Sequence, residues 1–316
     1  MDIDYLLLLQ DFRNGIDNAI TPFMEMISLF AVTYLVIIPA LIYWCVDKRA
    51  GLFTIGSYAA SVTVNALIKL SACIYRPWIR DSRVLPAGDA IRTATGYSFP
   101  SGHTMTAVPI YGGIVASTWK KIRWIAVLSL ICLLLTAFSR NYLGVHTPQD
   151  VMVGLVAGIL VLWGMAVLFR YLEKNPEKEN WFLAGGILLG IGALVYFSLK
   201  LYPMDYVDDK LLVDPQKMMK DGFGDTGKLI AFCAGRYIEK TWIRFKPVFS
   251  KRNLAAGLAG AVILFFLIES IGSPLQSALG LQWGALVQNM VIFLYITAGW
   301  PAVMKACAKH EEPVAA

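Results

Sequence analysis

Residues 149–169 read QDVMVGLVAGILVLWGMAVLF, and from Val151 to Phe169 this stretch carries no charged side chain. A helix needs about 20 predominantly apolar residues to cross the hydrocarbon core of a bilayer. The whole chain has the same character, with 57% hydrophobic and 16% charged residues and a mean hydropathy of +0.58. Soluble domains carry about a quarter charged residues. The sequence therefore predicts an all-α fold, a polytopic membrane helical bundle.

Similar apolar segments recur on both sides of this stretch. We expect nine candidate spans, at residues 21–44, 52–73, 103–118, 122–138, 149–169, 182–200, 226–238, 254–272 and 282–300. The third, fourth and seventh are short or weakly apolar, so we expect them to face protein rather than lipid. Residues 3–20 are expected to lie on the membrane surface as an amphipathic helix. The acidic N-terminus argues against a cleaved signal peptide, which would begin with basic residues.

The chain divides into two regions by the character of its segments. Residues 1–200 are predicted to form a six-span core that holds all the chemically suggestive motifs. Residues 201–316 are predicted to form an acidic outer loop, a basic inner loop and about three additional C-terminal spans. The acidic stretch 201–225 could also form a lid over a polar pocket.

The short loops between spans indicate the orientation. If the N-terminus lies outside and all nine segments span, 16 of the 28 Lys and Arg residues lie on the cytoplasmic side. The positive-inside rule then favours an outer N-terminus and an inner C-terminus. Segment 226–238 is the uncertain one, because it contains Lys228 and a re-entrant path there would put the C-terminus outside. The net charge of +6 therefore reports orientation and implies no nucleic-acid partner.

Lys69 and the pair Arg76-Pro77 close the second candidate span. Seven residues make two helical turns, which would place Lys69 and Arg76 on one helix face, roughly 10 Å apart. Pro77 disfavours helix at the residue before it, so the span should end near Arg76. A lysine inside an apolar span is a functional candidate. A structural lysine that reaches the membrane interface is an equal alternative.

Pro100-Ser101-Gly102-His103 stands immediately before the third candidate span. This order puts a hydroxyl, unpaired backbone N–H groups and an imidazole at a helix N-terminus. Helix N-termini bind anions because their amides are unpaired and the helix dipole is positive there. Taken alone, Ser101 would be interpreted as an ordinary helix cap.

Ser139-Arg140, His146 and Asp150 lie where the fourth span passes into the fifth. Thr147-Pro148 is typical of a helix start, so His146 should lie at the mouth of the helix and Asp150 one turn inside it. A carboxylate in that place can hold one imidazole nitrogen and leave the other free to attack. Asp150 can also cap the helix together with Thr147, and the two roles are compatible.

The predicted topology puts the three clusters on the same outer side of the membrane. Three cations, Lys69, Arg76 and Arg140, would then meet two of the three histidines of the chain. Such a set can neutralise a phosphoryl group and its transition state without a metal. The cysteines and acids show no metal-ligand spacing, so we expect no metal and no cofactor.

Together, Lys-x6-Arg-Pro, Pro-Ser-Gly-His and Ser-Arg-x5-His-x3-Asp resemble the three-part signature of the type 2 phosphatidic acid phosphatases. That superfamily also includes glucose-6-phosphatase and the vanadium haloperoxidases. All eleven fixed positions match in order and spacing. The motifs cover residues 69–150 directly, and the architecture resembles the six-span core over about 1–200. Nine spans with an outer N-terminus resemble the layout of glucose-6-phosphatase.

The resemblance implies a role for each matching residue. His146 would attack phosphorus to give a phosphohistidine, and Asp150 would orient it. His103 would protonate the leaving oxygen and then activate water. The phosphoryl oxygens would be held by Lys69, Arg76, Ser101, the Gly102 amide and Arg140. For this chemistry His146 must be neutral and His103 protonated, so their pKa values should differ.

The substrate is left open by the sequence. The main expectation is an integral protein of a bacterial cytoplasmic membrane that hydrolyses a lipid phosphate or diphosphate with its active site facing outward. The alternatives are a soluble sugar phosphate as substrate, a phosphotransferase that uses an alcohol in place of water, and a binding or transport protein without turnover. The oligomeric state is not predicted.

Several charged residues outside the motifs have two interpretations. The outer loop residues Arg80, Arg83 and Arg92 could bind a second phosphate or a headgroup, and they could equally be solvated. Glu25 and Glu269 lie within candidate spans, where acids are unusual. Structural and functional roles are equally open for these two.

Overall fold

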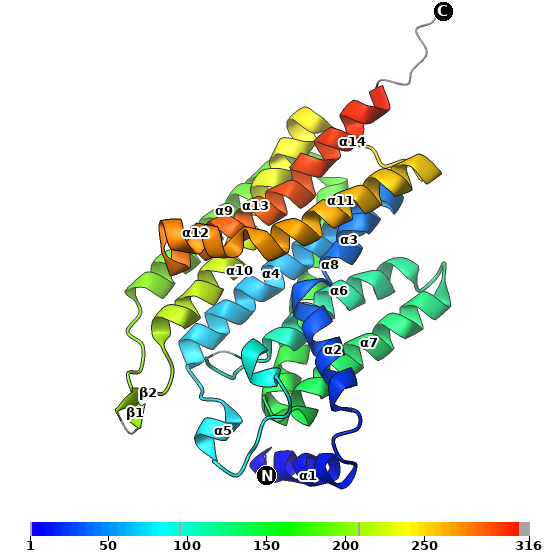
Figure 1. Cartoon of the computed structure of the whole chain (residues 1–316). Helices are drawn as coiled ribbons and strands as arrows, with labels where there is room; N and C mark the ends of the chain where they lie inside the picture. Colours follow the sequence, from blue (N-terminus) through cyan, green and yellow to red (C-terminus); the bar gives the residue numbers. More distant parts are fainter. Residues whose placement is uncertain (1, 95, 208, 310–316) are drawn as a thin grey trace, which may run out of the picture.

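The computed structural model describes residues 2–94, 96–207 and 209–309. Within these ranges most of the chain is helical, and the strands are those of one small hairpin, in which β1 (Tyr206–Val207) pairs antiparallel with β2 (Lys210–Leu211). Figure 1 shows the helices gathered into one elongated bundle, with α1 at the end opposite to α14. The predicted all-α class is therefore confirmed.

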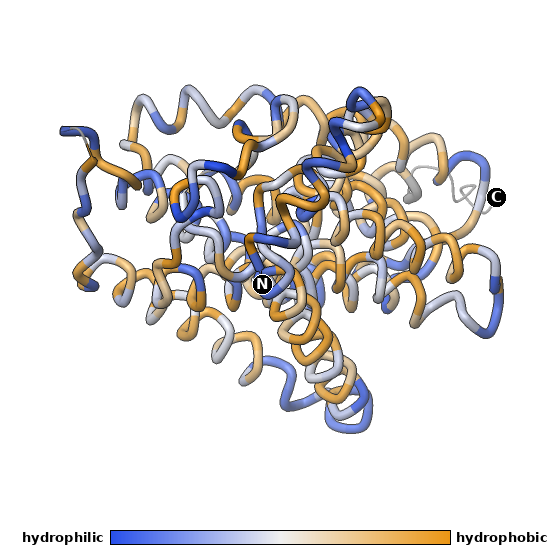
Figure 2. Tube along the Cα trace, turned by 90° about the horizontal axis from the view of Figure 1, so that it is seen from below, coloured by the Kyte–Doolittle hydropathy of each residue, from blue (hydrophilic) through white to orange (hydrophobic). Residues whose placement is uncertain are grey.

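The helices follow one another with short connections. In chain order they are α1 (Asp2–Gly15), α2 (Thr21–Thr33), α3 (Ile37–Leu41), α4 (Lys48–Ala72), α5 (Pro77–Arg80), α6 (Gly102–Thr118), α7 (Arg123–Tyr142), α8 (Pro148–Lys174), α9 (Glu179–Leu199), α10 (Pro215–Ile238), α11 (Lys251–Ser270), α12 (Gly272–Leu279), α13 (Leu281–Leu294) and α14 (Trp300–Lys309). Short π-helical or 3-10 turns, such as Glu239–Ile243, extend or join some of them. Figure 2 shows that apolar residues run along the helices while hydrophilic residues concentrate in the connections.

Fewer helices can cross a membrane than the sequence suggested. Six helical stretches in the described ranges are long and apolar enough: Lys48–Arg80, Arg123–Tyr142, Pro148–Lys174, Pro176–Leu199, Lys251–Ser270 and Leu281–Cys307. The pair Thr21–Thr33 and Ile37–Val46, bent by 49°, makes a seventh if it counts as one span. The polytopic membrane fold is confirmed, but nine spans are not reached.

Two of the expected spans are interior helices of a different kind. α6, which contains the expected span 103–118, has 17 residues, and most of them are buried. α10, which includes 226–238, begins at Pro215 and is too polar for a span; its charged side chains are Lys217, Lys220, Asp221, Asp225, Lys228 and Arg236. The acidic stretch 201–225 is therefore partly helix and not wholly loop. Both helices face protein, as expected.

The expectation that segment 122–138 also faces protein is wrong. α7 exposes a row of large apolar side chains on one face, among them Trp124, Leu128, Ile131 and Leu134. These residues are three or four positions apart, so they form one continuous stripe. An exposed apolar stripe on a membrane helix is a surface for lipid or for another protein.

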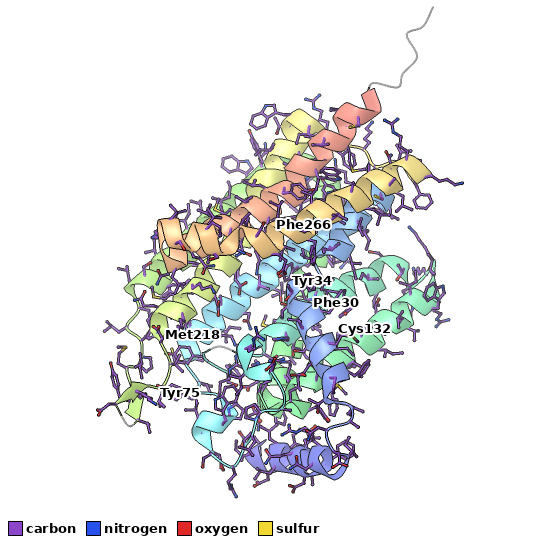
Figure 3. All side chains as sticks on the ribbon, viewed as in Figure 1. Phe30, Tyr34, Tyr75, Cys132, Met218 and Phe266 are labelled. Atoms are coloured by element: carbon purple, nitrogen blue, oxygen red, sulfur yellow. The ribbon has the colours of Figure 1, made fainter. Side chains whose placement is uncertain are left out.

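The predicted regions 1–200 and 201–316 share one hydrophobic core. A single cluster of buried side chains joins Tyr43 and Ile55 to Phe232 and Phe293. Tyr34 of α2 stacks on Phe265 of α11, with ring centroids 5.4 Å apart, and Figure 3 shows it at this junction. The division at residue 200 stays a prediction, since the packing is continuous across it.

A buried carboxylate joins the two regions at the α14 end of the bundle. Glu239 is 0% exposed and accepts hydrogen bonds from Lys48 Nζ at 2.6 Å and from the backbone N–H of Phe245 at 2.8 Å. Arg236 Nη1 also pairs with Glu239, and Arg236 Nε reaches Glu179 at 2.8 Å. Each of these charges has a partner, which a buried ion requires.

Candidate active site

Lys69 and Arg76 reach the same region by a path that differs from the prediction. α4 ends at Ala72, and Cys73 takes a left-handed conformation with φ 51°. Arg76 lies beyond it in extended backbone, as the residue before proline prefers. The two side chains therefore do not share one helix face. The helix ends four residues before Arg76 because Cys73 turns the chain.

Lys69 holds the segment that leads into α6. Its Nζ donates to the carbonyl oxygens of Tyr97 at 3.1 Å, Ser98 at 3.3 Å and Pro100 at 2.9 Å. Ser101 then caps α6, since its hydroxyl accepts from the Thr104 N–H at 3.4 Å. The first two sequence clusters are thus brought together by one ammonium group.

The start of α6 is also tied to the start of α8. The Ser101 N–H donates to the Asp150 carbonyl oxygen at 3.0 Å. A Cβ atom added at Gly154 would lie 3.2 Å from the Ser101 carbonyl oxygen, so glycine permits this close approach of α8 to α6. The second and third clusters therefore meet at two helix N-termini.

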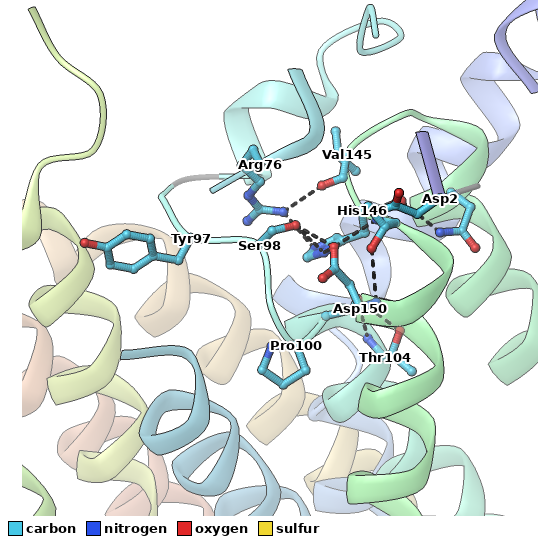
Figure 4. A network of polar contacts seen from close by, with 12 residues as sticks. Asp2, Arg76, Tyr97, Ser98, Pro100, Thr104, Val145, His146 and Asp150 are labelled. Carbon is cyan, nitrogen blue, oxygen red and sulfur yellow. Dashed lines mark hydrogen bonds and ion pairs between the residues drawn. The ribbon is translucent and has the colours of Figure 1, made fainter. Parts of the chain in front are cut away.

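The hydrogen bonds of His146 define its tautomer (Figure 4). Arg76 Nη1 lies 2.8 Å from His146 Nε2. Since a guanidinium can only donate, Nε2 must accept and carry the lone pair. Nδ1 then carries the hydrogen and faces Asp150 Oδ2 at 3.3 Å. Arg76 Nη1 also donates to the Val145 carbonyl oxygen at 2.9 Å, which joins the first cluster to the third.

Asp150 is held by more donors than the sequence indicated. Its Oδ2 accepts from the Thr147 N–H at 2.9 Å, which with the Thr147 side chain completes the capping box. The same oxygen accepts from Ser98 Oγ at 2.6 Å. Ser98 is 1% exposed and Asp150 is 2% exposed. Ser98 was not predicted, because it lies outside the three motifs and nothing in its own neighbourhood points to Asp150.

A cavity of about 510 Å³ opens beside these groups. The predicted site residues that line it are Lys69, Arg76, Gly102, His103 and His146. The rest of its wall comes largely from α4, α10 and α13. The side chain of Met218 on α10 accepts from the Tyr97 N–H at 3.0 Å, so α10 also contacts the segment that Lys69 holds. Residues beyond 200 thus build part of the cavity that contains both histidines.

Ser101 and Arg140 do not line the cavity. The Ser101 hydroxyl caps α6 in this structure, which is the capping role that the sequence suggested for Ser101 taken alone. Arg140 is 0% exposed, and its Nη1 donates to Ser28 Oγ. Arg140 Nε and Nη2 and His103 Nε2 are buried without a hydrogen-bond partner in the described part of the chain. Buried polar groups are normally paired, so these atoms are candidates to bind a ligand.

The two histidines share one electrostatic environment. Burial lowers the pKa of His146 well below its ordinary value, and the positive charges of Arg76, Lys69 and Arg140 lower it further. Burial and then Arg140 lower the pKa of His103 in the same direction. Both rings therefore favour the neutral form in this structure. That the two pKa values differ during the reaction stays a prediction.

The charged residues left open by the sequence lie outside this centre, except Glu269. Arg80 pairs with Asp2, Arg83 with Asp81 and Arg92 with Asp89. Glu25 accepts from the Asp89 N–H. Glu269 accepts from Tyr34 Oη at 2.9 Å and lines the cavity. Across the described residues no three His, Cys, Asp or Glu side chains gather as a metal-ligand set; that the reaction needs no metal stays a prediction.

The site residues lie within the part of the chain that is similar to a known protein family. The model of the PAP2 superfamily matches residues 50–174, which include all three motifs. Undecaprenyl-diphosphatase of Sulfolobus acidocaldarius is 29% identical over 111 residues, which cover 35% of this chain and 51% of that protein. Phosphatidylglycerophosphatase B of Bacillus subtilis is 27% identical over 180 residues, 55% of this chain and 83% of that protein.

A plant relative is similar over a shorter part. Lipid phosphate phosphatase delta of Arabidopsis thaliana is 33% identical over 88 residues, 25% of this chain and 21% of that protein. The chain thus spans about half the length of the archaeal relative and about a fifth of the plant one. No solved structure matches the chain significantly.

Proposed function

We propose that this chain, whose residues 50–174 match the model of the PAP2 superfamily, is an integral-membrane phosphatase that hydrolyses a lipid phosphate or diphosphate through a phosphohistidine intermediate. The observation that carries the proposal is the state of His146. Its Nε2 keeps the lone pair, lies beside Arg76 at 2.8 Å and lines the cavity, while Asp150 faces Nδ1. This is the arrangement of a nucleophile oriented by a carboxylate.

In the first step His146 Nε2 attacks phosphorus, a nitrogen–phosphorus bond forms, and the bond from phosphorus to the leaving oxygen breaks. His103 gives a proton to that oxygen. In the second step His103 takes a proton from water, which attacks phosphorus and releases His146. Lys69, Arg76 and Arg140 balance the phosphoryl charge without a metal. A bound phosphate raises the pKa of a nearby imidazole, which provides the proton on His103.

The membrane fold supports a lipid substrate. Three of the six candidate spans, Lys48–Arg80, Lys251–Ser270 and Leu281–Cys307, contribute residues to the cavity, so a lipid can keep its chains in hydrocarbon while its phosphate reaches His146. Each methylene kept out of water contributes about 0.8 kcal/mol. The relatives described above are named for action on undecaprenyl diphosphate, phosphatidylglycerophosphate and lipid phosphate, and these names agree with a lipid substrate.

The distribution of basic residues supports an outward-facing site. Lys48, Arg236, Lys240 and Lys305 gather at the α14 end of the bundle, where Lys305 binds the Ile243 carbonyl oxygen. The loops that carry Arg76 and His146 lie toward the α1 end (Figure 1). By the positive-inside rule, this distribution favours a cytoplasmic position for the α14 end.

Phosphate release from purified protein tests the function. We expect His146→Ala to abolish turnover of a panel of lipid phosphates and His310→Ala, at the third histidine, to leave it intact. Rapid quenching with a radiolabelled substrate should trap an acid-labile phosphohistidine in the wild type and none in His146→Ala. Near-normal phosphate release by His146→Ala would refute the mechanism.

The same panel decides the substrate class. We expect kcat/KM for lipid phosphates to exceed that for glucose 6-phosphate by far in the same detergent, because a soluble ester gains nothing from the bilayer. If glucose 6-phosphate equals or exceeds every lipid, the enzyme is a sugar phosphatase. If the leaving alcohol is released only when an acceptor alcohol is added, and the phosphoryl group is recovered as an ester of that acceptor, it is a phosphotransferase.

A further inference from the structure

The wall of the active-site cavity away from the two histidines has polar side chains that the reaction does not use. It is built by α10, α12 and α13, and the polar residues relevant here are Asp225, Lys228, Gln276, Gln288 and Asn289. All five lie beyond residue 200, outside the segment that matches the PAP2 model. Because this wall and His146 line one cavity, a substrate whose phosphate lies at His146 can contact the wall with the part that leaves.

Close packing fixes this wall against the catalytic helices. A Cβ atom at Gly224 would lie 2.8 Å from Asn289 Nδ2, and one at Gly227 would lie 2.8 Å from the Leu286 carbonyl oxygen. Glycine at these two positions therefore lets α13 approach α10 closely. Thr63 Oγ1, on the same helix as Lys69, donates to the Asp225 carbonyl oxygen at 3.2 Å. These contacts fix the position of the wall relative to the helix that carries Lys69.

The charges on the wall compensate one another. Lys228 Nζ lies 2.6 Å from Asp225 Oδ1 and 5.6 Å from the centre of the Tyr58 ring. The cavity also has the carboxylates of Asp221 and Glu269 in its lining. A second phosphate placed here would meet three carboxylates against two ammonium groups of α10, Lys220 and Lys228, and Lys228 is already paired. The wall therefore does not favour another anion.

Two amides on α13 offer one donor and one acceptor to a ligand. Gln288 Oε1 accepts from Gln276 Nε2 at 3.4 Å, and Asn289 Nδ2 donates to the Ala285 carbonyl oxygen at 2.9 Å. Gln288 Nε2 and Asn289 Oδ1 make no hydrogen bond with the part of the protein that the structure describes. The Gln288 N–H can donate to an alcohol hydroxyl and the Asn289 C=O can accept from one, because a hydroxyl both accepts and donates.

We propose that Gln288 and Asn289 bind a hydroxyl group of the leaving alcohol, so that the enzyme selects phosphate monoesters whose alcohol carries a further hydroxyl. This inference rests on the proposed phosphatase function and adds a specificity subsite to it. The C-terminal region is then a part of the substrate site.

A matched pair of substrates isolates the hydroxyl. We would compare 1-oleoyl-glycerol 3-phosphate with 1-oleoyl-propane-1,3-diol 3-phosphate, which lacks only the central hydroxyl. Wild-type kcat/KM should favour the hydroxylated ester by about tenfold, since the deoxy ester leaves amide groups of the site unpaired. In Gln288→Met and in Asn289→Leu the ratio of the two kcat/KM values should fall toward one.

Gln282→Met is the matched control. Gln282 lies on the same helix, outside the cavity lining, and contacts Gln216. This variant should keep the wild-type ratio. Equal kcat/KM for both esters in the wild type, or an unchanged ratio in both α13 variants, would overturn the subsite. Absence of phosphate release from either ester and from the wider panel would instead reject the phosphatase function itself.

Discussion

Replacing Asp150 by asparagine tests how the nucleophile is oriented. One oxygen, Oδ2, faces the Ser98 hydroxyl at 2.6 Å, the Thr147 N–H at 2.9 Å and His146 Nδ1 at 3.3 Å. The asparagine oxygen can take the same place, so the geometry is kept while the charge is lost. Hydrogen bonds to charged groups contribute about 1.5–3 kcal/mol and neutral ones about 0.5–1.5 kcal/mol.

The effect on catalysis exceeds the effect on stability. The carboxylate supports the positive imidazole that forms when His146 is phosphorylated, and losing it should raise the barrier by about 2–3 kcal/mol, or about 30- to 150-fold in kcat. The folded state loses charge assistance as well. It is also relieved of a buried carboxylate, which offsets part of that loss. Turnover is therefore the measurement that reports orientation.

Initial rates of phosphate release at saturating lipid phosphate would give kcat for wild type, Asp150→Asn and the control Asp89→Asn. Asp89 is exposed and pairs with Arg92, so its variant should match the wild type. Ser98→Ala removes one of the three donors and should lower kcat by less than Asp150→Asn does. A kcat of Asp150→Asn within about threefold of wild type would refute the orienting role. Complete loss, as deep as in His146→Ala, would mean that Asp150 does more than orient.

Three further outcomes follow from the site and the topology. The pKa values of His103 and His146 are lowered in the folded protein, so below pH ~6.5 the unfolded chain binds more protons than the folded one. Thermal stability should therefore fall as the pH drops from 7.5 to 5. An equally steep fall in the His146→Gln variant would contradict this cause. Activity should survive EDTA and be inhibited by vanadate, and a loss that added magnesium restores would oppose the metal-free mechanism. A cysteine that replaces Asp89 should react with an impermeant maleimide in intact cells, and a cysteine that replaces Lys121 should react only after the membrane is opened. The reverse pattern would place the active site in the cytoplasm.

The motif residues were predictable because each motif has its own local geometry. Thr147-Pro148 begins α8 with a capping box, and Asp150 faces His146 one turn inside, as the spacing indicated. Ser101 caps α6 in the same predictable way. The path from Lys69 to Arg76 was not predictable, since the left-handed turn at Cys73 has no glycine to mark it.

Features that depend on distant packing could not be found in the sequence. Ser98 reaches Asp150 because Lys69 gathers the carbonyl groups around it, a contact between three separate segments. Residues 226–238 were expected to span the membrane, but α10 as a whole has too many charges for a span, and its apolar face packs against α4 and α13. The amides of Gln288 and Asn289 lack any motif. Their relation to the cavity comes only from the fold.

The central place of α4 has a consequence for how the protein is made. Its buried side chains include Ser61 and Asn65, and one of its faces packs against α10, which emerges much later from the ribosome. At ~5–20 residues per second, the delay between the two helices is on the order of 10 s. During that interval this face of α4 lacks its final neighbour within the bilayer. Biogenesis should therefore depend on an insertase or chaperone that shields α4 until α10 arrives, and shortening the chain before residue 215 should turn the nascent protein into a substrate for membrane proteolysis.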